Sequence, residues 1–204
     1  MKNENRIGIL DLDISNVESL KSAVNFLGFN SQIIKVNDNI EQFEKIVIPG
    51  CGSFPSAMKK VSLNKFYLRL KEYVKNKKIL GICLGMQIFL KKSDEFKKTK
   101  GLGLINLDIC KLDMIPKIPN VGFRKVKINK QNYLFNNIKN NTEFYFMHSY
   151  GVANFKSLKP DSYISFGKSK IVSSVSKKNF FGTQFHPEKS GKNGLTYLYN
   201  FFKI

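Results

Sequence analysis

The sequence has no long apolar run and few cysteines. None of its apolar stretches approaches the roughly 18 residues that cross a membrane, and residues 1–6 precede only four apolar residues before Asp11. This pattern predicts neither a membrane span nor a secretory signal. Three cysteines, an odd number in a chain of 204 residues, do not suggest a disulfide framework. We therefore expect a cytoplasmic protein with no membrane partner.

Arginine is also scarce, which changes the meaning of the strong positive charge. The formal net charge is +19, but the only arginines are Arg6, Arg69 and Arg124, and the remaining positive charge is lysine spread along the chain. Arginine is the usual residue for reading bases and phosphates. Scattered lysines are instead typical of a solvated basic surface. We therefore predict no nucleic-acid partner, whereas attraction to an acidic protein remains open.

The first half of the chain alternates between short apolar runs and runs with helical spacing. The predicted strands are residues 6–11, 32–36, 45–48 and 79–82, and the predicted helices are residues 17–27 and 63–74. Such alternation predicts a three-layer α/β fold, in which a mainly parallel sheet carries helices on both faces. Ligands of such a sheet gather at the carboxyl ends of its strands, where Cys83 and the turn of residues 49–54 both lie.

The second half has a different pattern. Its strand-like runs lie too close together for parallel units with crossover helices, and they therefore predict antiparallel strands. These runs are residues 121–128, 143–147, 171–175 and 180–185. Residues 91–100 are expected to form a charged loop, and residues 194–202 a helix with Leu195, Leu198, Tyr199 and Phe202 on one face. No repeat or boundary divides residues 1–204, so we expect a single domain.

Cys83 lies at a sharp turn between a predicted strand and a predicted helix. Gly81 and Gly85 flank it at two residues on either side, as a strained and crowded backbone requires. This arrangement predicts an exposed thiol at the carboxyl end of a strand, and a following helix whose positive end favours thiolate over thiol. The alternative is a core cysteine, because cysteine is among the most buried residue types.

His186 is one of only two histidines, and Glu188 follows it by two residues. Pro187 biases His186 toward an extended backbone, in which residues two apart project to the same side. Glu188 can then hold the imidazole ring and stabilise its charged form. If the fold brings this pair to Cys83, the result is a triad of nucleophile, base and orienting carboxylate. The alternative is a loop histidine paired with a neighbouring carboxylate.

Together these two segments resemble the class I glutamine amidotransferases, and the resemblance covers nearly the whole chain. The segment GICLGMQ at residues 81–87 is similar to the family's nucleophile segment, and QFHPE at residues 184–188 is similar to its base segment. Within the family the chain is most similar to the glutaminase subunit of imidazole glycerol phosphate synthase. The segments PGCGSFPSAM at residues 49–58 and MHSY at residues 147–150 carry this closer resemblance.

The resemblance implies that Cys83 attacks the side-chain amide of L-glutamine, that His186 protonates the departing ammonia, and that water then cleaves a thioester. The oxyanion is expected to meet the N–H of Leu84 and an amide of the turn formed by Gly50, Cys51 and Gly52. The expected glutamine-binding residues are Gln87, Glu95, His148, Ser149 and Tyr150. For His148, packing at a strand end is the alternative to a chemical role. No metal and no organic cofactor is implied.

The resemblance also implies a partner, because ammonia released into water is mostly protonated and lost as a nucleophile. We expect a heterodimer with a cyclase or synthase subunit that receives ammonia directly. The expected partner-facing residues are Asn16, Asn120, Phe123 and Arg124. This face departs from the family pattern: where the family has His, Trp and Asn in P-H-[MI]-G-W-N, this chain has Asn120, Phe123 and Arg124.

These departures leave three alternatives to histidine biosynthesis open. The chain could supply ammonia for amidination of a surface sugar, act as a non-catalytic binding module, or work alone as a cysteine hydrolase on another amide. All three triad residues are present, which argues against the binding module. An assay with glutamine, with and without candidate partners, separates the alternatives.

Overall fold

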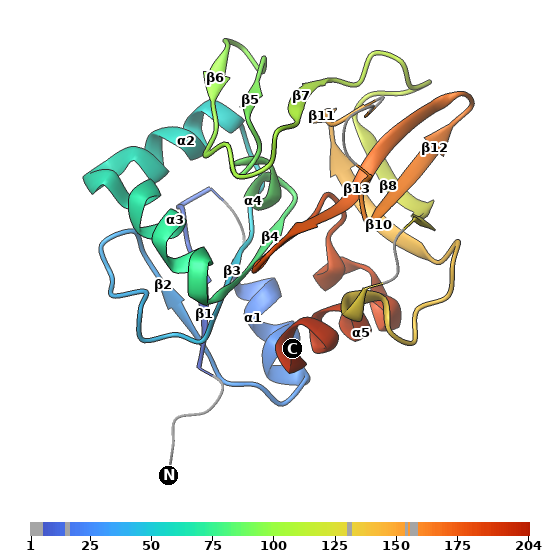
Figure 1. Cartoon of the computed structure of the whole chain (residues 1–204). Coiled ribbons are helices and arrows are strands. Elements are labelled where there is room, and N and C mark those ends of the chain that lie inside the picture. The colour runs from blue at the N-terminus through green and yellow to red at the C-terminus, as the bar shows by residue number, and fades with distance from the viewer. Residues whose placement is uncertain (1–5, 15–16, 130–131, 154, 156–158) are drawn as a thin grey trace.

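The computed structural model describes residues 6–14, 17–129, 132–153, 155 and 159–204, and an eight-stranded sheet forms its centre (Figure 1). The strand order is β2-β1-β3-β4-β14-β13-β12-β9. Strands β2, β1, β3, β4 and β14 are parallel to one another, and β13, β12 and β9 extend the sheet antiparallel. Their bounds are β1 (Ile7–Leu10), β2 (Ser31–Ile34), β3 (Lys45–Ile48), β4 (Lys78–Ile82), β9 (Lys127–Ile128), β12 (Ser162–Phe166), β13 (Ser169–Lys177) and β14 (Phe180–Thr183).

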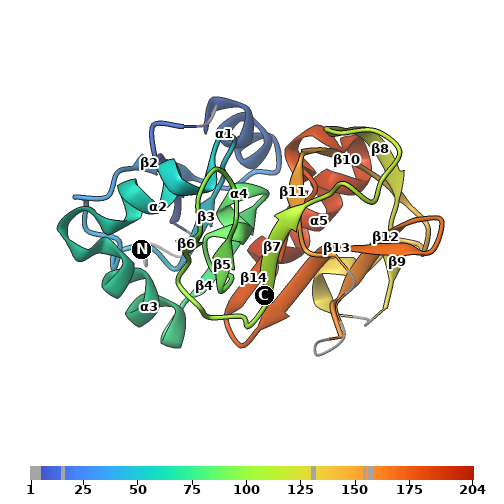
Figure 2. The ribbon, with the colours of Figure 1, turned by 90° about the horizontal axis from the view of Figure 1, so that it is seen from above.

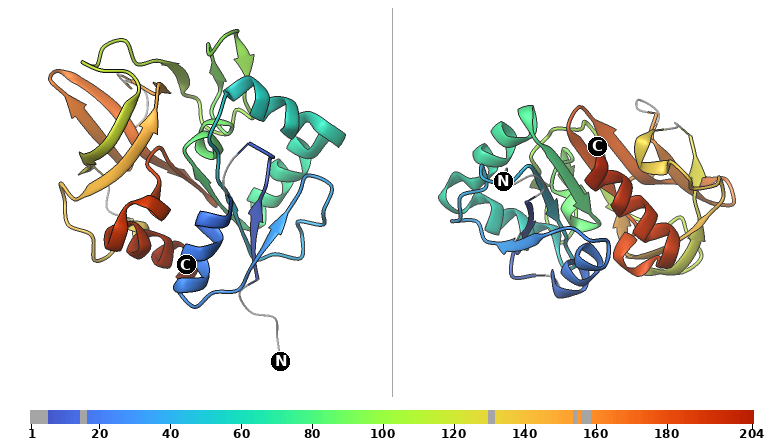
Figure 3. Two further views of the ribbon diagram at one scale, coloured as in Figure 1. Left: turned by 180° about the vertical axis from the view of Figure 1, so that it is seen from behind. Right: turned by 90° about the horizontal axis from the view of Figure 1, so that it is seen from below.

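Helices cover both faces of the parallel part (Figure 2; Figure 3, right). The helices are α1 (Val17–Phe26), α2 (Phe54–Ser62), α3 (Phe66–Asn76), α4 (Leu84–Gln87) and α5 (Gly191–Lys203). Alternate residues of β3 face opposite sides: Ile46 and Ile48 join the core under α2 and α3, whereas Val47 joins the core under α1 and α5. Strands buried on both faces in this way are typical of parallel sheets.

Two smaller sheets flank the carboxyl ends of the parallel strands. Strands β8 (Asn120–Lys125) and β10 (Glu143–His148) form an antiparallel pair, and a four-stranded sheet has the order β11-β7-β5-β6. The members of the latter are β5 (Lys92–Ser93), β6 (Thr99–Lys100), β7 (Asp108–Lys111) and β11 (Tyr150–Gly151). Short 3₁₀ turns are η1 (Leu63–Lys65), η2 (Tyr133–Phe135) and η3 (Pro187–Lys189). No helix among the described residues is long and apolar enough to cross a membrane.

The predicted fold class is confirmed, with differences in detail. Helix α2 was not predicted; its Pro55 lies in the first turn, where a missing N–H is tolerated. The predicted helix of residues 63–74 begins only at Phe66, after η1. The predicted charged loop of residues 91–100 contains the hairpin strands β5 and β6. Strands β7 and β12 were also missed, because each is short and mixes polar with apolar residues.

The buried face of α5 differs from the predicted one. Tyr197, Leu198, Phe201 and Phe202 are buried, whereas Tyr199 is 42% exposed. The reason is tertiary packing: the ring of Tyr197 contacts the rings of Phe135, Phe144 and Phe185 in the core beneath the helix. Aromatic contacts of this kind decide which of two similar apolar stripes turns inward.

Candidate active site

Cys83 connects β4 to α4 in a strained backbone conformation, as the flanking glycines predicted. Its φ is +54° and its ψ is −110°, which a residue with a side chain rarely adopts. Gly81 and Gly85 permit the turn: a Cβ on Gly85 would clash with the carbonyl of Ile48, and a Cβ on Gly81 would clash with Gly85 itself. The N–H of Cys83 donates to the carbonyl oxygen of Thr183 at 2.6 Å, which ties the turn to β14.

The thiol is less accessible than the sequence suggested. Cys83 is only 6% exposed and lies in the wall of a cavity of about 260 Å³. Helix α4 has four residues, so its dipole is much weaker than that of a full helix. The expectation of an exposed cysteine at the start of a full helix is therefore corrected: the thiol is buried, and the helix that follows it is a single short turn.

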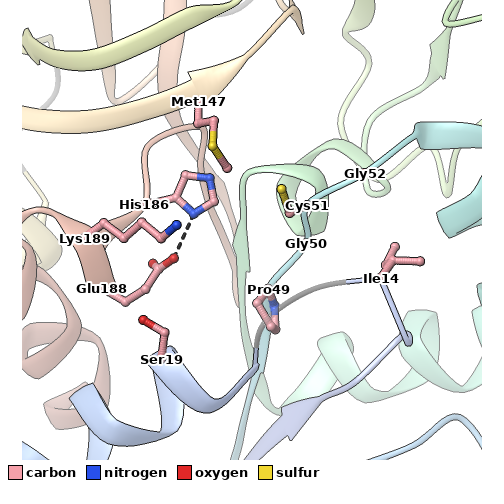
Figure 4. A pocket seen from close by; sticks show the side chains of 10 residues that line it. All are labelled: Ile14, Ser19, Pro49, Gly50, Cys51, Gly52, Met147, His186, Glu188 and Lys189. Atoms are coloured by element: carbon pink, nitrogen blue, oxygen red, sulfur yellow. Dashed lines mark hydrogen bonds and ion pairs between the residues drawn. The ribbon is translucent and has the colours of Figure 1, made fainter.

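His186 and Glu188 form the predicted pair beside Cys83. Pro187 leaves His186 extended, with φ −99° and ψ 97°, and Glu188 lies in η3. Its Oε1 is 2.8 Å from Nδ1 of His186, and both side chains are almost fully buried (Figure 4). Burial alone lowers the pKa of His186, but the nearby Cys83 sulfur and the Glu188 carboxylate outweigh it and raise that pKa to about 10.

The second ring nitrogen of His186 is available for chemistry. Nε2 is buried and has no hydrogen-bond partner among the described residues, while Nδ1 is held by Glu188. With its tautomer and orientation fixed through Nδ1, the ring can exchange a proton through Nε2. The structure thus brings Cys83, His186 and Glu188 together, although their motifs are about a hundred residues apart in sequence.

The 260 Å³ cavity also contains the predicted glutamine-binding residues. Its lining includes Gln87, Glu95, His148, Ser149 and Tyr150. Among the described residues of this lining, Glu95 contributes the only carboxylate, and its Oε2 accepts a 2.6 Å hydrogen bond from the N–H of Phe54 at the start of α2. The volume is slightly below the roughly 300–1,000 Å³ of most ligand sites. The cavity therefore fits a small polar ligand that carries a cationic group.

The predicted oxyanion elements lie side by side. Leu84 is the first residue of α4, so its N–H has no acceptor within the helix. Gly50 packs directly against Leu84, where a Cβ would lie only 2.7 Å from the Leu84 Cβ. Cys51 and Gly52 line the 260 Å³ cavity and also a second cavity of about 440 Å³ on the His186 side, which Figure 4 shows. Residues of both segments thus line the same cavity as the thiol.

The predicted partner-facing residues differ in exposure. Phe123 is 50% exposed, whereas Asn120 is 1% exposed and turns inward. Asn120 contacts Nε2 of His148 at 3.0 Å, so its side chain does not face outward. The expectation that Asn120 faces a partner subunit is therefore corrected. Arg124 folds back onto its own strand, where it donates to the carbonyls of Phe123 and Val121. Asn16 lies outside the described residues.

Sequence reasoning missed two groups that contact the sulfur of Cys83. The side-chain amide of Gln184 lies 3.4 Å from Sγ, and the carbonyl oxygen of Met147 lies 3.9 Å from it. Gln184 precedes His186 by two residues in an extended segment, so the same alternation that linked His186 to Glu188 could have identified it. No sequence signal points to a backbone carbonyl such as that of Met147. The described residues contain no cluster of His, Cys, Asp or Glu that could hold a metal ion.

Comparison with known proteins agrees with this geometry. The family model of class I glutamine amidotransferases matches residues 8–204. A relative from Methanocaldococcus jannaschii, named imidazole glycerol phosphate synthase subunit HisH, is 40% identical over 97% of this chain and 99% of its own length. A Campylobacter jejuni relative, named imidazole glycerol phosphate synthase subunit HisH 1, is 38% identical over 97% of this chain and all of its own length.

Solved structures show the same fold. A chain of the structure described as PurLQS from Thermotoga maritima superimposes with a TM-score of 0.76 at 17% identity, over 98% of each chain. Another chain, described as a glutamine amidotransferase, superimposes with a TM-score of 0.74 at 13% identity, over 97% of this chain and 99% of its own. The resemblance drawn from the motifs around Cys83 and His186 is confirmed over nearly the whole length. The chain belongs to the class I glutamine amidotransferase family.

Proposed function

We propose that this protein is the glutamine-hydrolysing subunit of an imidazole glycerol phosphate synthase. The observation that carries the proposal is the convergence of Cys83 with the His186–Glu188 pair beside a small cavity that Glu95 lines. Relatives at 36–40% identity over almost the whole chain bear that subunit's name, which supports histidine biosynthesis over amidination of a surface sugar. The intact triad speaks against a non-catalytic binding module.

The proposed reaction proceeds through a thioester. The sulfur of Cys83 bonds to the side-chain carbonyl carbon of glutamine, and the oxygen becomes an oxyanion that the amides of Leu84 and the 50–52 turn stabilise. The protonated His186 then gives its Nε2 proton to the amide nitrogen, and the C–N bond breaks to release ammonia. A water molecule next loses a proton to His186 and attacks the thioester, which releases glutamate and regenerates the thiolate.

Substrate orientation follows from the cavity lining. The carboxylate of Glu95 is suited to the α-ammonium group of glutamine, and Gln87 has a side-chain oxygen that can accept a further hydrogen bond from it. Ser149 and Tyr150 line the same cavity. Such contacts would place the side-chain amide of glutamine against Cys83 and discriminate against the shorter asparagine.

Release of ammonia as the product implies a partner subunit that uses it. Ammonia in water at neutral pH is mostly protonated, so the hydrolysing subunit is useful only when an attached synthase receives the free base. We propose a cytoplasmic heterodimer with a cyclase subunit, consistent with three free cysteines among the described residues. The exposed ring of Phe123 supports docking of that subunit on the face formed by β8.

A coupled assay tests this function. Glutamate release from glutamine is measured for the chain alone and with the cyclase subunit from the same organism, with Cys83→Ala as the control. We expect hydrolysis of glutamine but not asparagine, stimulation by the cyclase, and no activity in Cys83→Ala. Hydrolysis of another amide in preference to glutamine would contradict the proposal, and so would full activity of Cys83→Ala.

A further inference from the structure

A buried glutamine lies directly against the proposed nucleophile. The Gln184 side chain is fully buried, and its Nε2 lies 3.4 Å from Sγ of Cys83. Its Oε1 accepts a 3.0 Å hydrogen bond from Nε2 of Gln87. Two further polar groups lie beside the sulfur: the carbonyl oxygen of Met147, at 3.9 Å, and the imidazole ring of His186. Of the two hydrogen-bonding contacts with measured distances, the one to Met147 is to an acceptor and the one to Gln184 is to an amide donor.

The orientation of Gln184 follows from its neighbours. The carbonyl oxygen of Tyr150 can only accept, so the Gln87 group 3.1 Å from it must be the NH₂ group. The second hydrogen of that NH₂ group goes to Gln184, which must therefore turn its oxygen toward Gln87. Its own NH₂ group is then left facing the sulfur of Cys83. Both donors are therefore assigned from the Tyr150 carbonyl oxygen, which can only accept a hydrogen bond.

A series of hydrogen bonds also connects the Tyr150 carbonyl oxygen to Arg124. Nδ1 of His148 lies 2.9 Å from the Tyr150 oxygen, Asn120 lies 3.0 Å from Nε2 of His148, and Arg124 donates to Asn120 at 2.9 Å. Burial lowers the pKa of His148 to about 4, so its ring is neutral and has one donor and one acceptor nitrogen. Arg124 has only donors and the Tyr150 carbonyl only accepts, so the donor and the acceptor of every hydrogen bond between them are fixed.

We propose that Gln184 is a positioning residue that holds the Cys83 sulfur and favours its thiolate form by donating a hydrogen bond to it. The inference rests on the proposed function only in taking Cys83 as the nucleophile. A thiol can donate its hydrogen to the Met147 carbonyl, but a thiolate cannot. Loss of the proton therefore strengthens the bond from Gln184 and removes the one to Met147, because hydrogen bonds to charged groups are the stronger ones.

The test separates this role from simple packing. Alkylation of Cys83 by iodoacetamide is followed against pH, with the Cys83 peptide quantified by mass spectrometry, in wild type and Gln184→Met. Methionine keeps the length of the side chain but removes its donor. We expect the midpoint of the alkylation profile to rise by about one pH unit, which slows alkylation about tenfold near neutral pH.

Thr183→Val is the matched control. Thr183 is fully buried next to Gln184, and its hydroxyl donates to the Phe185 carbonyl without reaching the sulfur. This variant also loses a buried hydrogen bond, so its alkylation profile should match that of wild type. An unchanged profile in a folded Gln184→Met, or equal shifts in both variants, would overturn the role.

A second variant keeps the inference testable if Gln184→Met does not fold. Gln87→Met leaves Gln184 in place but removes the group that fixes its direction, so the midpoint should rise by less than in Gln184→Met; no rise would count against the proposal. Alkylation does not depend on glutamine turnover. Failure of the wild-type protein to hydrolyse glutamine would therefore contradict the proposed function. The role of Gln184 would still be decided by the alkylation experiment.

Discussion

The two sides of the active site are built in different ways. On the nucleophile side, backbone contacts hold Cys83 in place: Gly85 packs against the carbonyl of Ile48, and Gly50 packs against Leu84. On the base side, side-chain hydrogen bonds hold the groups: Glu188 binds His186, and Gln184 bridges Gln87 and the sulfur. The first side therefore depends on close packing and the second on the matching of hydrogen-bond donors with acceptors. Substitutions on the first side should mainly lower stability, whereas substitutions on the second should mainly lower activity.

Gly85→Ala should have the largest effect and should act on folding. The added Cβ would clash with the backbone carbonyl of Ile48, and backbone cannot move aside as a flexible side chain can. We expect a loss of more than about 3 kcal/mol in the free energy of unfolding, at the upper end for overpacking. The measurement is urea denaturation followed by circular dichroism.

Gly28→Ala is the matched control for that experiment. Gly28 has a φ of +80° but open space around the position of a Cβ. Only backbone strain should result, at about 1 kcal/mol. Equal losses of stability in the two variants would mean that the turn at Cys83 is not held by close packing.

His186→Ala should act on chemistry and leave folding largely intact. Removal of the proposed general base should lower the rate of glutamine hydrolysis at least about a hundredfold. Glu188→Gln should lower it less, because the amide can still hydrogen-bond to the ring while the charge is lost. The measurement is the steady-state rate at saturating glutamine. A fully active His186→Ala would show that the base has been assigned to the wrong residue.

The pH dependence of stability should identify the His186–Glu188 pair. Because the folded-state pKa of His186 is raised from 6.5 to about 10, its contribution to stability is fully present below pH 6.5 and is lost as the pH rises toward 10. Glu188→Gln should therefore lower the free energy of unfolding most near pH 6, by about 1–3 kcal/mol. Urea denaturation at pH 6, 8 and 10 measures this difference. A constant difference over that range would contradict the pairing.

Phe123→Ala should have the smallest effect, and only on the complex. The ring is half exposed in the free chain and contacts Tyr145 edge-on, so truncation removes surface rather than core. We expect about tenfold weaker binding to the cyclase, or about 1.4 kcal/mol, measured by calorimetry. Phe123→Trp, which restores the family's residue, should instead strengthen binding to a cyclase from another organism. Unchanged affinity in both variants would remove Phe123 from the interface.

The sequence revealed the nucleophile side more fully than the base side. Glycine spacing around Cys83 predicted the strained turn, because only close backbone contacts require glycine at both flanking positions. The parallel strands were likewise evident from apolar runs of four or five residues. These features depend on local sequence, and local patterns are what a single sequence records.

Apart from the His186–Glu188 pair, which local alternation predicted, the base side depended on long-range contacts that no local pattern specifies. The bonds from Gln184 to Gln87 and from Asn120 to His148 join residues that are far apart in sequence. Asn120 was expected on the partner face from its position in a motif, but its amide is buried by the ring of His148. The position of helix α2 and the buried face of α5 were decided in the same way, by tertiary packing overriding local preference.

The most direct test is to find which cysteine a glutamine-like electrophile modifies. Cys51 is exposed, Cys110 has a thiol whose pKa is raised by burial, and Cys83 alone has the His186–Glu188 pair beside it. The protein is treated with a chloroketone analogue of glutamine, with and without excess glutamine, and its peptides are mapped by mass spectrometry. We predict one label per chain, on Cys83, and protection by glutamine. Labelling mainly on Cys51 or Cys110, or labelling that glutamine does not suppress, would contradict the assignment of Cys83 as the nucleophile.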